Sequence, residues 1–447
     1  MKRELSAIPA RASLHRAKQR EHRAPAPLTL ALLVLLLALA PASFGAGVVI
    51  NEIHFDPPEK KPLEFIELFN ASAAAVDLGG WELEKFKFPP ETTIAPHGFI
   101  VVARDPAALA KTFGNVKALG PLPGRLKHHG EKITLHDSRG RLVDEVRYGA
   151  GFPWPTASVG GGASLERVHP DLPGAFASSW RGSGFRVNGA GKLAPPTPGK
   201  INSVFSTNAP PFVENVAHLP AQPRAGEAVT VIVTLAELRG VTNVLLQVQI
   251  VEPGRYIRKA DADFAKAWRD FPMRGDGRGT FTATVPGELQ VHRRLLRYRV
   301  RVEQPEFATL LPYTDDGSPN FAWFCHNGVP AWTGASQPGK TAPLTFSSEF
   351  LGTLPTYHLI ANRTDVERSQ WDGGANKQRF TGTFVYEGHV YDHIQFHNRG
   401  QASTHVAGTN KWGFHFNRAR EFEPRDLWGN EYPHTWNNFD MNACASP

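Results

Sequence analysis

Cysteine is scarce in this chain of 447 residues, with Cys325 and Cys444 as its two examples. Two thiols can form at most one disulfide, so a disulfide framework cannot hold the fold together. Each folded module must therefore be stabilised by an apolar core of its own. The sequence leaves open whether the two cysteines pair with each other.

An apolar run long enough to span a membrane is also missing. The run 28–40 has thirteen residues, whereas a helix needs about twenty to cross a bilayer. It follows seven Lys or Arg and two Glu within 1–23, and the small-residue stretch APASFGAG comes next. This order is typical of a secretory signal peptide, which we place at 1–45. We expect a secreted or cell-surface protein with no stable membrane span, and an uncleaved anchor is the less favoured alternative.

Excess positive charge is scarce once the leader is set aside. The formal net charge is +7, and the leader carries five of these units (seven basic minus two acidic), which leaves about +2. No specific nucleic-acid partner is therefore implied. The Arg-rich stretch 291–303 alternates with apolar residues from Leu296 to Val302. We interpret its charges as the outer face of a strand.

Most familiar catalytic motifs are absent, including a nucleophile elbow, HExxH, a Walker loop and a dinucleotide-binding fingerprint. His389, His393 and His397 recur at every fourth position, which on a helix could gather around one metal ion. We predict a strand here, and residues four apart on a strand are roughly 13 Å apart, too far for two rings to reach one zinc ion. We interpret these histidines as surface or packed residues and predict no metal site.

Glycine and proline are plentiful, at 41 and 37 residues, and long helical repeats are few. This composition favours β modules joined by turns. We expect a mainly β protein with tandem immunoglobulin-like β-sandwiches at 46–204 and 205–348, followed by a partial α+β domain at 349–447. Alternating segments in the second sandwich include EAVTVIVTLAE, NVLLQVQIVE, GTFTATVPG and LLRYRVRVE.

Carboxylates gather early in the first module. Asn51 and Glu52 precede Glu64 and Glu67 on neighbouring predicted strands, and hard oxygen donors could bind Ca²⁺ if they converged. Glu64 and Glu67 are three residues apart, however, and point to opposite faces of a regular strand. We therefore favour solvated or Arg-paired carboxylates over a calcium site.

The first module resembles the lamin-tail domain, an immunoglobulin-like sandwich that occurs in exported bacterial proteins. The resemblance covers nearly the whole module and is carried, in order, by INEIHFDP, EFIELFNAS, VDLGGWEL, GEKITLHDSRGRLVDEVRYG, SLERV and TPGKIN. It implies an attachment or interaction module with no fixed chemistry.

The third module begins with a predicted β-hairpin around Glu387-Gly388. A further strand follows, in which Trp412, Phe414 and Phe416 share one face. Lys411, Gly413 and His415 must then share the other face. An ammonium group beside a loop of small residues could contact phosphate, although a solvated strand lysine is the more common arrangement.

The same segment resembles the opening of the CotH (spore coat protein H) kinase family. The resemblance is carried by LPTYHLIANRTDVE, FTGTFVYEGHVYDHIQFHNRGQAS and NKWGFHF. It implies that Arg399 and Gly400 occupy the family's Arg-Gly position and that Lys411 lies in its Lys-bearing strand, where these residues would bind the nucleotide. The implied cofactors are ATP and Mg²⁺.

The family's catalytic and metal-binding aspartates lie further downstream than Pro447. Phosphoryl transfer depends on charge neutralisation by metal, so we expect this chain to be catalytically silent. We interpret its end as that of an incomplete gene model or a fragment, and a naturally short protein is the alternative. The complete form would transfer the γ-phosphoryl group of ATP to Ser on exported or surface proteins. The alternative is a non-catalytic binding protein whose β modules attach to extracellular proteins or polysaccharide.

Overall fold

The computed structural model describes residues 47–58, 61–114, 116–335, 340–371, 378–399, 411–426 and 428–441. The predicted leader 1–45, Gly400 and Cys444 lie outside these ranges. The described chain is mainly β, as the sequence predicts. None of the described helices has the length and apolar character needed to cross a membrane.

The first module contains two main antiparallel sheets that share one core. The larger sheet has the order β12-β11-β1-β2-β7-β8, with a parallel pair only between β7 and β8, and the smaller has the order β10-β9-β4-β5. Their strands are β1 (Val48–His54), β2 (Phe65–Asn70), β4 (Glu82–Leu83), β5 (Phe86–Lys87), β7 (Phe99–Ala103), β8 (Ala118–Leu119), β9 (Gly130–His136), β10 (Leu142–Gly149), β11 (Leu165–Arg167) and β12 (Trp180–Gly182).

The smaller elements of this module are α1 (Pro106–Phe113), the short 3-10 helix η2 (Ala177–Ser179) and the paired strands β3 (Val76–Asp77) and β6 (Thr93–Ile94). Asp105 caps α1 by accepting a hydrogen bond from the Ala108 amide, and Pro106 follows at the first helical position, so the sequence fixes where this helix begins. Side chains from both sheets, including Ile50, Ile133 and Trp180, pack into the shared core.

The second module is a β-sandwich. One sheet has the order β13-β14-β18-β17, and the other has the order β16-β15-β19-β20 with β21 also paired to β19. The elements are β13 (Val213–Leu219), β14 (Val229–Leu235), β15 (Asn243–Val251), α2 (Ala262–Lys266), β16 (Arg269–Pro272), β17 (Arg274–Gly275), β18 (Thr280–Val285), β19 (Leu295–Glu303), β20 (Ala308–Leu311) and β21 (Phe321–Phe324). Alternate residues of β14 and β19 fill its core, as the period-two pattern predicts. Cys325, next to β21, is a buried free thiol.

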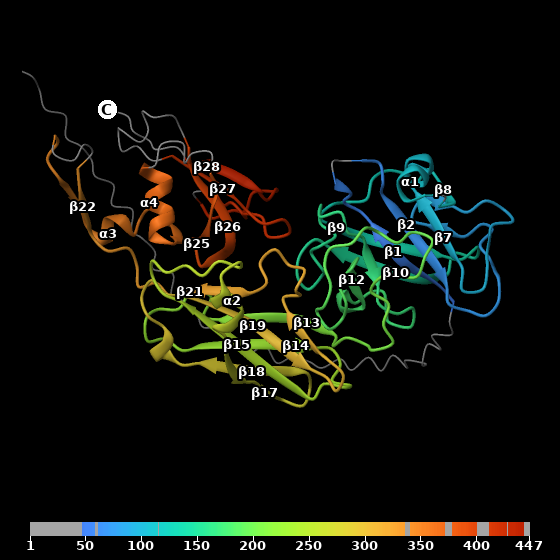
Figure 1. Cartoon of the computed structure of the whole chain (residues 1–447), viewed down its shortest axis with the longest axis horizontal. Helices are drawn as coiled ribbons and strands as arrows, with labels where there is room; N and C mark the ends of the chain where they lie inside the picture. The colour runs from blue at the N-terminus through green and yellow to red at the C-terminus, as the bar shows by residue number, and fades with distance from the viewer. Residues whose placement is uncertain are drawn as a thin grey trace, which may run out of the picture. The chain divides into compact units, whose positions relative to one another are not determined.

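The third module is built on a five-stranded antiparallel sheet with the order β24-β25-β26-β27-β28, accompanied by helix α4 (Figure 1). The elements from here to the end of the described chain are β22 (Trp332–Gly334), β23 (Leu344–Phe346), α3 (Ser348–Leu351), β24 (Tyr357–Ala361), α4 (Arg363–Trp371), β25 (Phe380–Tyr386), β26 (His389–Arg399), β27 (Lys411–His415) and β28 (Asn438–Met441). The predicted hairpin is confirmed: Glu387 and Gly388 both have positive φ, at 48° and 81°, as a tight two-residue turn requires.

Candidate functional site

The two predicted nucleotide contacts in the described chain lie side by side. Arg399 at the end of β26 is the direct cross-strand partner of Lys411 at the start of β27. Directly opposite residues of an antiparallel pair project to the same face of the sheet. The same register places His397 opposite Gly413, and His415 also belongs to this side. We call Arg399, Lys411, His397 and His415 the polar face.

The opposite side of these strands is apolar. Phe396, Phe414 and Phe439 lie in the core of the third module, and Trp412 packs against it. The predicted division of the last strand into an apolar and a polar side is therefore confirmed. Because one side of the sheet is held by this core, strand register places the Cα atoms of the two cations opposite each other on the other side.

The electrostatics of the polar face distinguish its two cations. The Nη1 atom of Arg399 lies 3.0 Å from Oδ2 of Asp440 on β28, which offsets part of its charge. Lys411 is partly buried, and no ion pair of Lys411 occurs within the described ranges. Lys411 is therefore the cation of this face with more of its charge left for an anion.

The two histidine rings of the polar face stack with centroids 5.5 Å apart. Burial, together with the positive charge of Arg379, lowers the pKa of both His397 and His415. The imidazole of His397 lies over Gly413 so closely that a Cβ atom there would collide with it. This packing requires glycine at 413, which explains why a residue without a side chain occupies that position of the strand.

The three histidines of β26 occupy separate surroundings. His389 is exposed, His397 lies on the polar face, and His393 is buried with a positive φ of 57°. A register shift in the β25–β26 pair accompanies this irregular backbone. The ring Nε2 atom of His393 lies 2.8 Å from Oδ1 of Asn320, so its partner is an amide of the second module. This is a packed histidine, as the sequence predicts.

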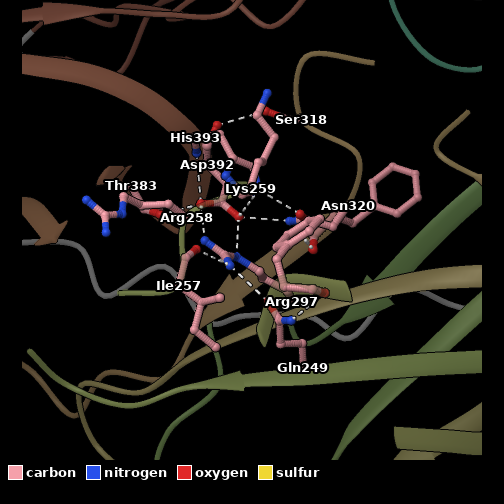
Figure 2. A network of polar contacts seen from close by, with 12 residues as sticks. Gln249, Ile257, Arg258, Lys259, Arg297, Ser318, Asn320, Thr383, Asp392 and His393 are labelled. Atoms are coloured by element: carbon pink, nitrogen blue, oxygen red, sulfur yellow. Dashed lines mark hydrogen bonds and ion pairs between the residues drawn. The ribbon is translucent and has the colours of Figure 1, made fainter. Parts of the chain in front are cut away.

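A buried ion pair joins the second and third modules, and sequence reasoning missed it (Figure 2). Nε and Nη2 of Arg297 donate to the two carboxylate oxygens of Asp392 at 2.6 and 3.1 Å. The side chain of Arg297 is 0% exposed and that of Asp392 is 3% exposed. The prediction that the charges of 291–303 form a solvent-facing row is therefore wrong at Arg297, because a second sheet covers it.

Neighbouring polar groups complete the contacts of this pair. Nη1 of Arg297 donates to Oε1 of Gln249 and to the carbonyl of Ile257, while the hydroxyls of Tyr256 and Thr383 and the amide of Asn320 donate to Asp392. Burial raises the pKa of Asp392, but Arg297 and these hydrogen bonds outweigh it and hold the pKa well below the usual range. Burial lowers the pKa of His393 to about 3, which leaves its ring neutral at pH 7. Arg297 and Asp392 thus find several hydrogen-bond partners inside the protein, as a buried ion pair requires.

The carboxylates of the first module differ from the prediction. Glu64 is paired with Arg104 at 3.0 Å, as predicted. Glu52, however, lies directly opposite Glu67 on β2 and Glu166 on β11, and all three residues are 0% exposed. We call Glu52, Glu67 and Glu166 the glutamate row. It is neither solvated nor Arg-paired, so that prediction is wrong for Glu52 and Glu67.

The donors to the glutamate row come from a segment far along the chain. Within 197–204, which we call the closing segment, Thr197 donates to Glu52, Gly199 to Glu67, and Ser203 to Glu166. Burial, reinforced by Glu166 and Glu67, raises the pKa of Glu52 well above its usual value. Burial also raises the pKa of Glu67 to about 8 and raises that of Glu166. Across the described residues, no group of three His, Cys, Asp or Glu is arranged to hold a metal ion.

Comparison with known proteins identifies one part of the chain. Residues 41–150 match the family model described as Lamin Tail Domain, so the chain carries a lamin-tail domain there. The match ends at β10, whereas the larger sheet continues through β11 and β12. No curated protein matches the chain. The immunoglobulin-like assignment of the second module and the CotH-like assignment of the third stay predictions.

Proposed function

We propose that the third module binds the phosphates of a nucleotide on its polar face, as the N-terminal part of a CotH-type kinase domain. The observation that carries this proposal is the direct cross-strand pairing of Arg399 with Lys411 on the side of the sheet opposite its aromatic core. Two neighbouring cations of fixed spacing favour a ligand with more than one anionic oxygen. The phosphate chain of ATP carries several anionic oxygens of this kind.

Each residue has a distinct role in this proposal. The Lys411 ammonium contacts phosphate oxygens, and Arg399, oriented by Asp440, supplies a planar donor beside it. Gly400 lies outside the described residues, so its role rests on the family resemblance. Mg²⁺ would neutralise phosphate charge when bound with ATP, and Ser on exported proteins would be the acceptor for the complete domain.

Export of the protein is part of the same proposal, because the acceptors would be surface or secreted proteins. Its support is the basic region, short apolar run and small-residue stretch of 1–45. A second candidate function is binding of extracellular proteins or polysaccharide by the β modules without catalysis. The lamin-tail match favours it, since that fold serves as an interaction module.

Calorimetry with ATP and Mg²⁺ tests nucleotide binding. We expect Lys411→Ala to weaken binding about tenfold or more, because a charge-assisted contact is lost. We expect Lys411→Arg to retain part of the affinity. Lys87→Ala, which removes an exposed strand lysine of the first module, is the matched control and should bind as the wild type does.

Pyrophosphate and adenosine separate phosphate recognition from base recognition in the same experiment. We expect pyrophosphate to compete with ATP and adenosine to compete poorly. Absence of ATP binding in the wild-type protein, or equal affinity in Lys411→Ala and Lys87→Ala, would contradict the proposal and leave binding by the β modules as the favoured function.

A further inference from the structure

A cleft of about 720 Å³ lies where the first module, the linker and the second module meet. Its walls come from 171–176, the linker 207–212, and two loops of the second module at 236–240 and 304–307. Ligand sites commonly have volumes of a few hundred to a thousand Å³ and occur between modules. Neither the polar face nor the network around Asp392 contributes to this cleft.

One wall of the cleft is apolar. The rings of Phe176 and Phe212 meet edge to face with centroids 5.2 Å apart, and Phe176 is 38% exposed. Further apolar lining residues include Leu172, Pro210, Pro211 and Phe307. Aromatic grooves of this kind bind polyproline II segments, because a proline ring packs flat against an aromatic ring and the extended peptide is already ordered before binding.

The rim of the cleft is acidic. Asp171, Glu237 and Glu306 line it together with one basic residue, Arg239. Nε of Arg239 lies 3.1 Å from Oε1 of Glu237, so the charges of these two side chains offset each other. Asp171 and Glu306 leave the rim with negative charge. A basic side chain is the complementary group, and a nucleic acid or an acidic polymer would be repelled.

An unsatisfied acceptor lies in the same cleft. The amide nitrogen of Gln304 donates to the carbonyl of Ala209 in the linker at 3.1 Å. Its Oε1 atom is buried and has no hydrogen-bond partner among the described residues. A buried acceptor without a donor is costly. Because this atom is closed to solvent, a ligand N–H group would satisfy it only after the Gln304 side chain turns toward the cleft.

We propose that this cleft binds an extended, proline-containing segment of a partner protein with Lys or Arg beside its prolines. The prolines pack on Phe176 and Phe212. The basic side chain meets Asp171 or Glu306, and a peptide N–H or guanidinium N–H donates to Oε1 of Gln304 once that side chain turns toward the cleft. This site gives the two sandwiches a binding activity that is independent of the nucleotide proposal.

Fluorescence anisotropy with a labelled peptide tests the proposal. The probe is fluorescein-labelled Pro-Pro-Arg-Pro-Pro-Lys-Pro-Pro, and a matched peptide has Glu at both basic positions. We expect the basic peptide to bind the purified protein more tightly than the acidic one and to bind less tightly as salt is raised. We expect Phe176→Ala and Glu306→Lys each to lower its affinity about tenfold or more.

Two matched variants outside the cleft test whether any similar loss of an aromatic ring or change of charge lowers peptide binding. Phe350→Ala removes an exposed phenylalanine on α3, and Glu288→Lys makes the same charge change at an exposed site of the second module. Both should bind the probe as the wild type does. Failure of the basic peptide to saturate, equal binding of the acidic peptide, equal losses in the control variants, or binding of cellohexaose in its place would each overturn the proposal.

Discussion

The guanidinium of Arg297 donates to both oxygens of Asp392 at a position that solvent does not reach. Removing two charges from water is expensive, and mutual attraction repays this only when every remaining donor and acceptor is satisfied. Gln249 and Thr383 are among the groups that supply the missing partners. Removing one member of this ion pair should therefore lower the free energy of unfolding more than removing both members.

We predict that Asp392→Ala destabilises the protein by about 3–5 kcal/mol, because the buried guanidinium of Arg297 is left unpaired. The double variant Arg297→Met/Asp392→Leu should be clearly more stable than Asp392→Ala alone. Urea unfolding of the single and double variants measures this coupling. Strictly additive losses in the double variant would mean that the two side chains do not act as a pair.

The period-two pattern of 291–303 predicted correctly which of its residues face the core. The apolar positions from Leu296 to Val302 lie in the core of the second module, as predicted. Arg297 belongs to the other side of β19, which a single-module pattern assigns to solvent. Its partner Asp392 is 95 residues away in the chain and belongs to another sheet. A contact between modules leaves no periodic signal in either strand, so the pattern could not reveal it.

At the scale of elements, the glutamate row places like charges on three adjacent strands. Glu52 has a carboxylate directly opposite it on each side, an arrangement that is destabilising when the groups are ionised. The raised pKa of Glu67, about 8, means that its folded form holds a proton that the unfolded chain releases above about 4.5. The stability from this proton is fully present below pH 4.5 and is lost as the pH rises through 8.

We predict that the closing segment opens more readily at alkaline pH. Hydrogen exchange of its amides, corrected for the intrinsic pH dependence of exchange, should show an opening free energy that falls as the pH rises from about 4.5 to about 8 and levels off above that range. The slope should be at most about 1.4 kcal/mol per pH unit for one proton. Glu67→Gln should flatten this dependence, whereas Glu145→Gln, a half-exposed residue of β10 paired with Lys132, should not. A steep slope that survives in Glu67→Gln would exclude Glu67 as its source.

Local elements were predicted where the signal is local. The Glu387-Gly388 turn and the two sides of β27 follow from residues next to each other in the chain, and both are confirmed. Glu52 and Glu67 were mispredicted because their donors Thr197 and Gly199 follow more than a hundred residues later. Of the proposed nucleotide contacts, strand register could bring Lys411 beside Arg399, but the ion pair of Arg399 with Asp440 requires knowledge of β28.

At the scale of the whole molecule, the leader predicted at 1–45 bears on both charge and destination. We predict that the exported protein begins after Ala42 or Gly45, with about +2 formal net charge instead of +7. N-terminal sequencing and intact mass of protein secreted from a bacterial host measure this. Recovery of the chain with Met1 intact in the membrane fraction would favour an uncleaved anchor instead.

Module boundaries are less visible in sequence than module cores. The lamin-tail model ends at 150, yet the larger sheet of the first module continues to β12, and hydrogen bonds to the glutamate row reach Val204. The later strands are short and separated by loops, so they contribute little periodic signal. Their place in the module becomes evident only from pairing across the sheet.

The buried free thiol of Cys325 gives the second module a chemical reporter. The Cys325 amide donates a hydrogen bond to the carbonyl of Arg294 beside β19. Burial raises the pKa of the Cys325 thiol. Alkylating reagents attack exposed thiolate, so the reagent must wait until the sandwich opens. With Cys444 replaced by serine, the alkylation rate would time that opening without any engineered label. Because cysteine is so scarce in this chain, alkylation of this one side chain would report the opening rate of the whole second module.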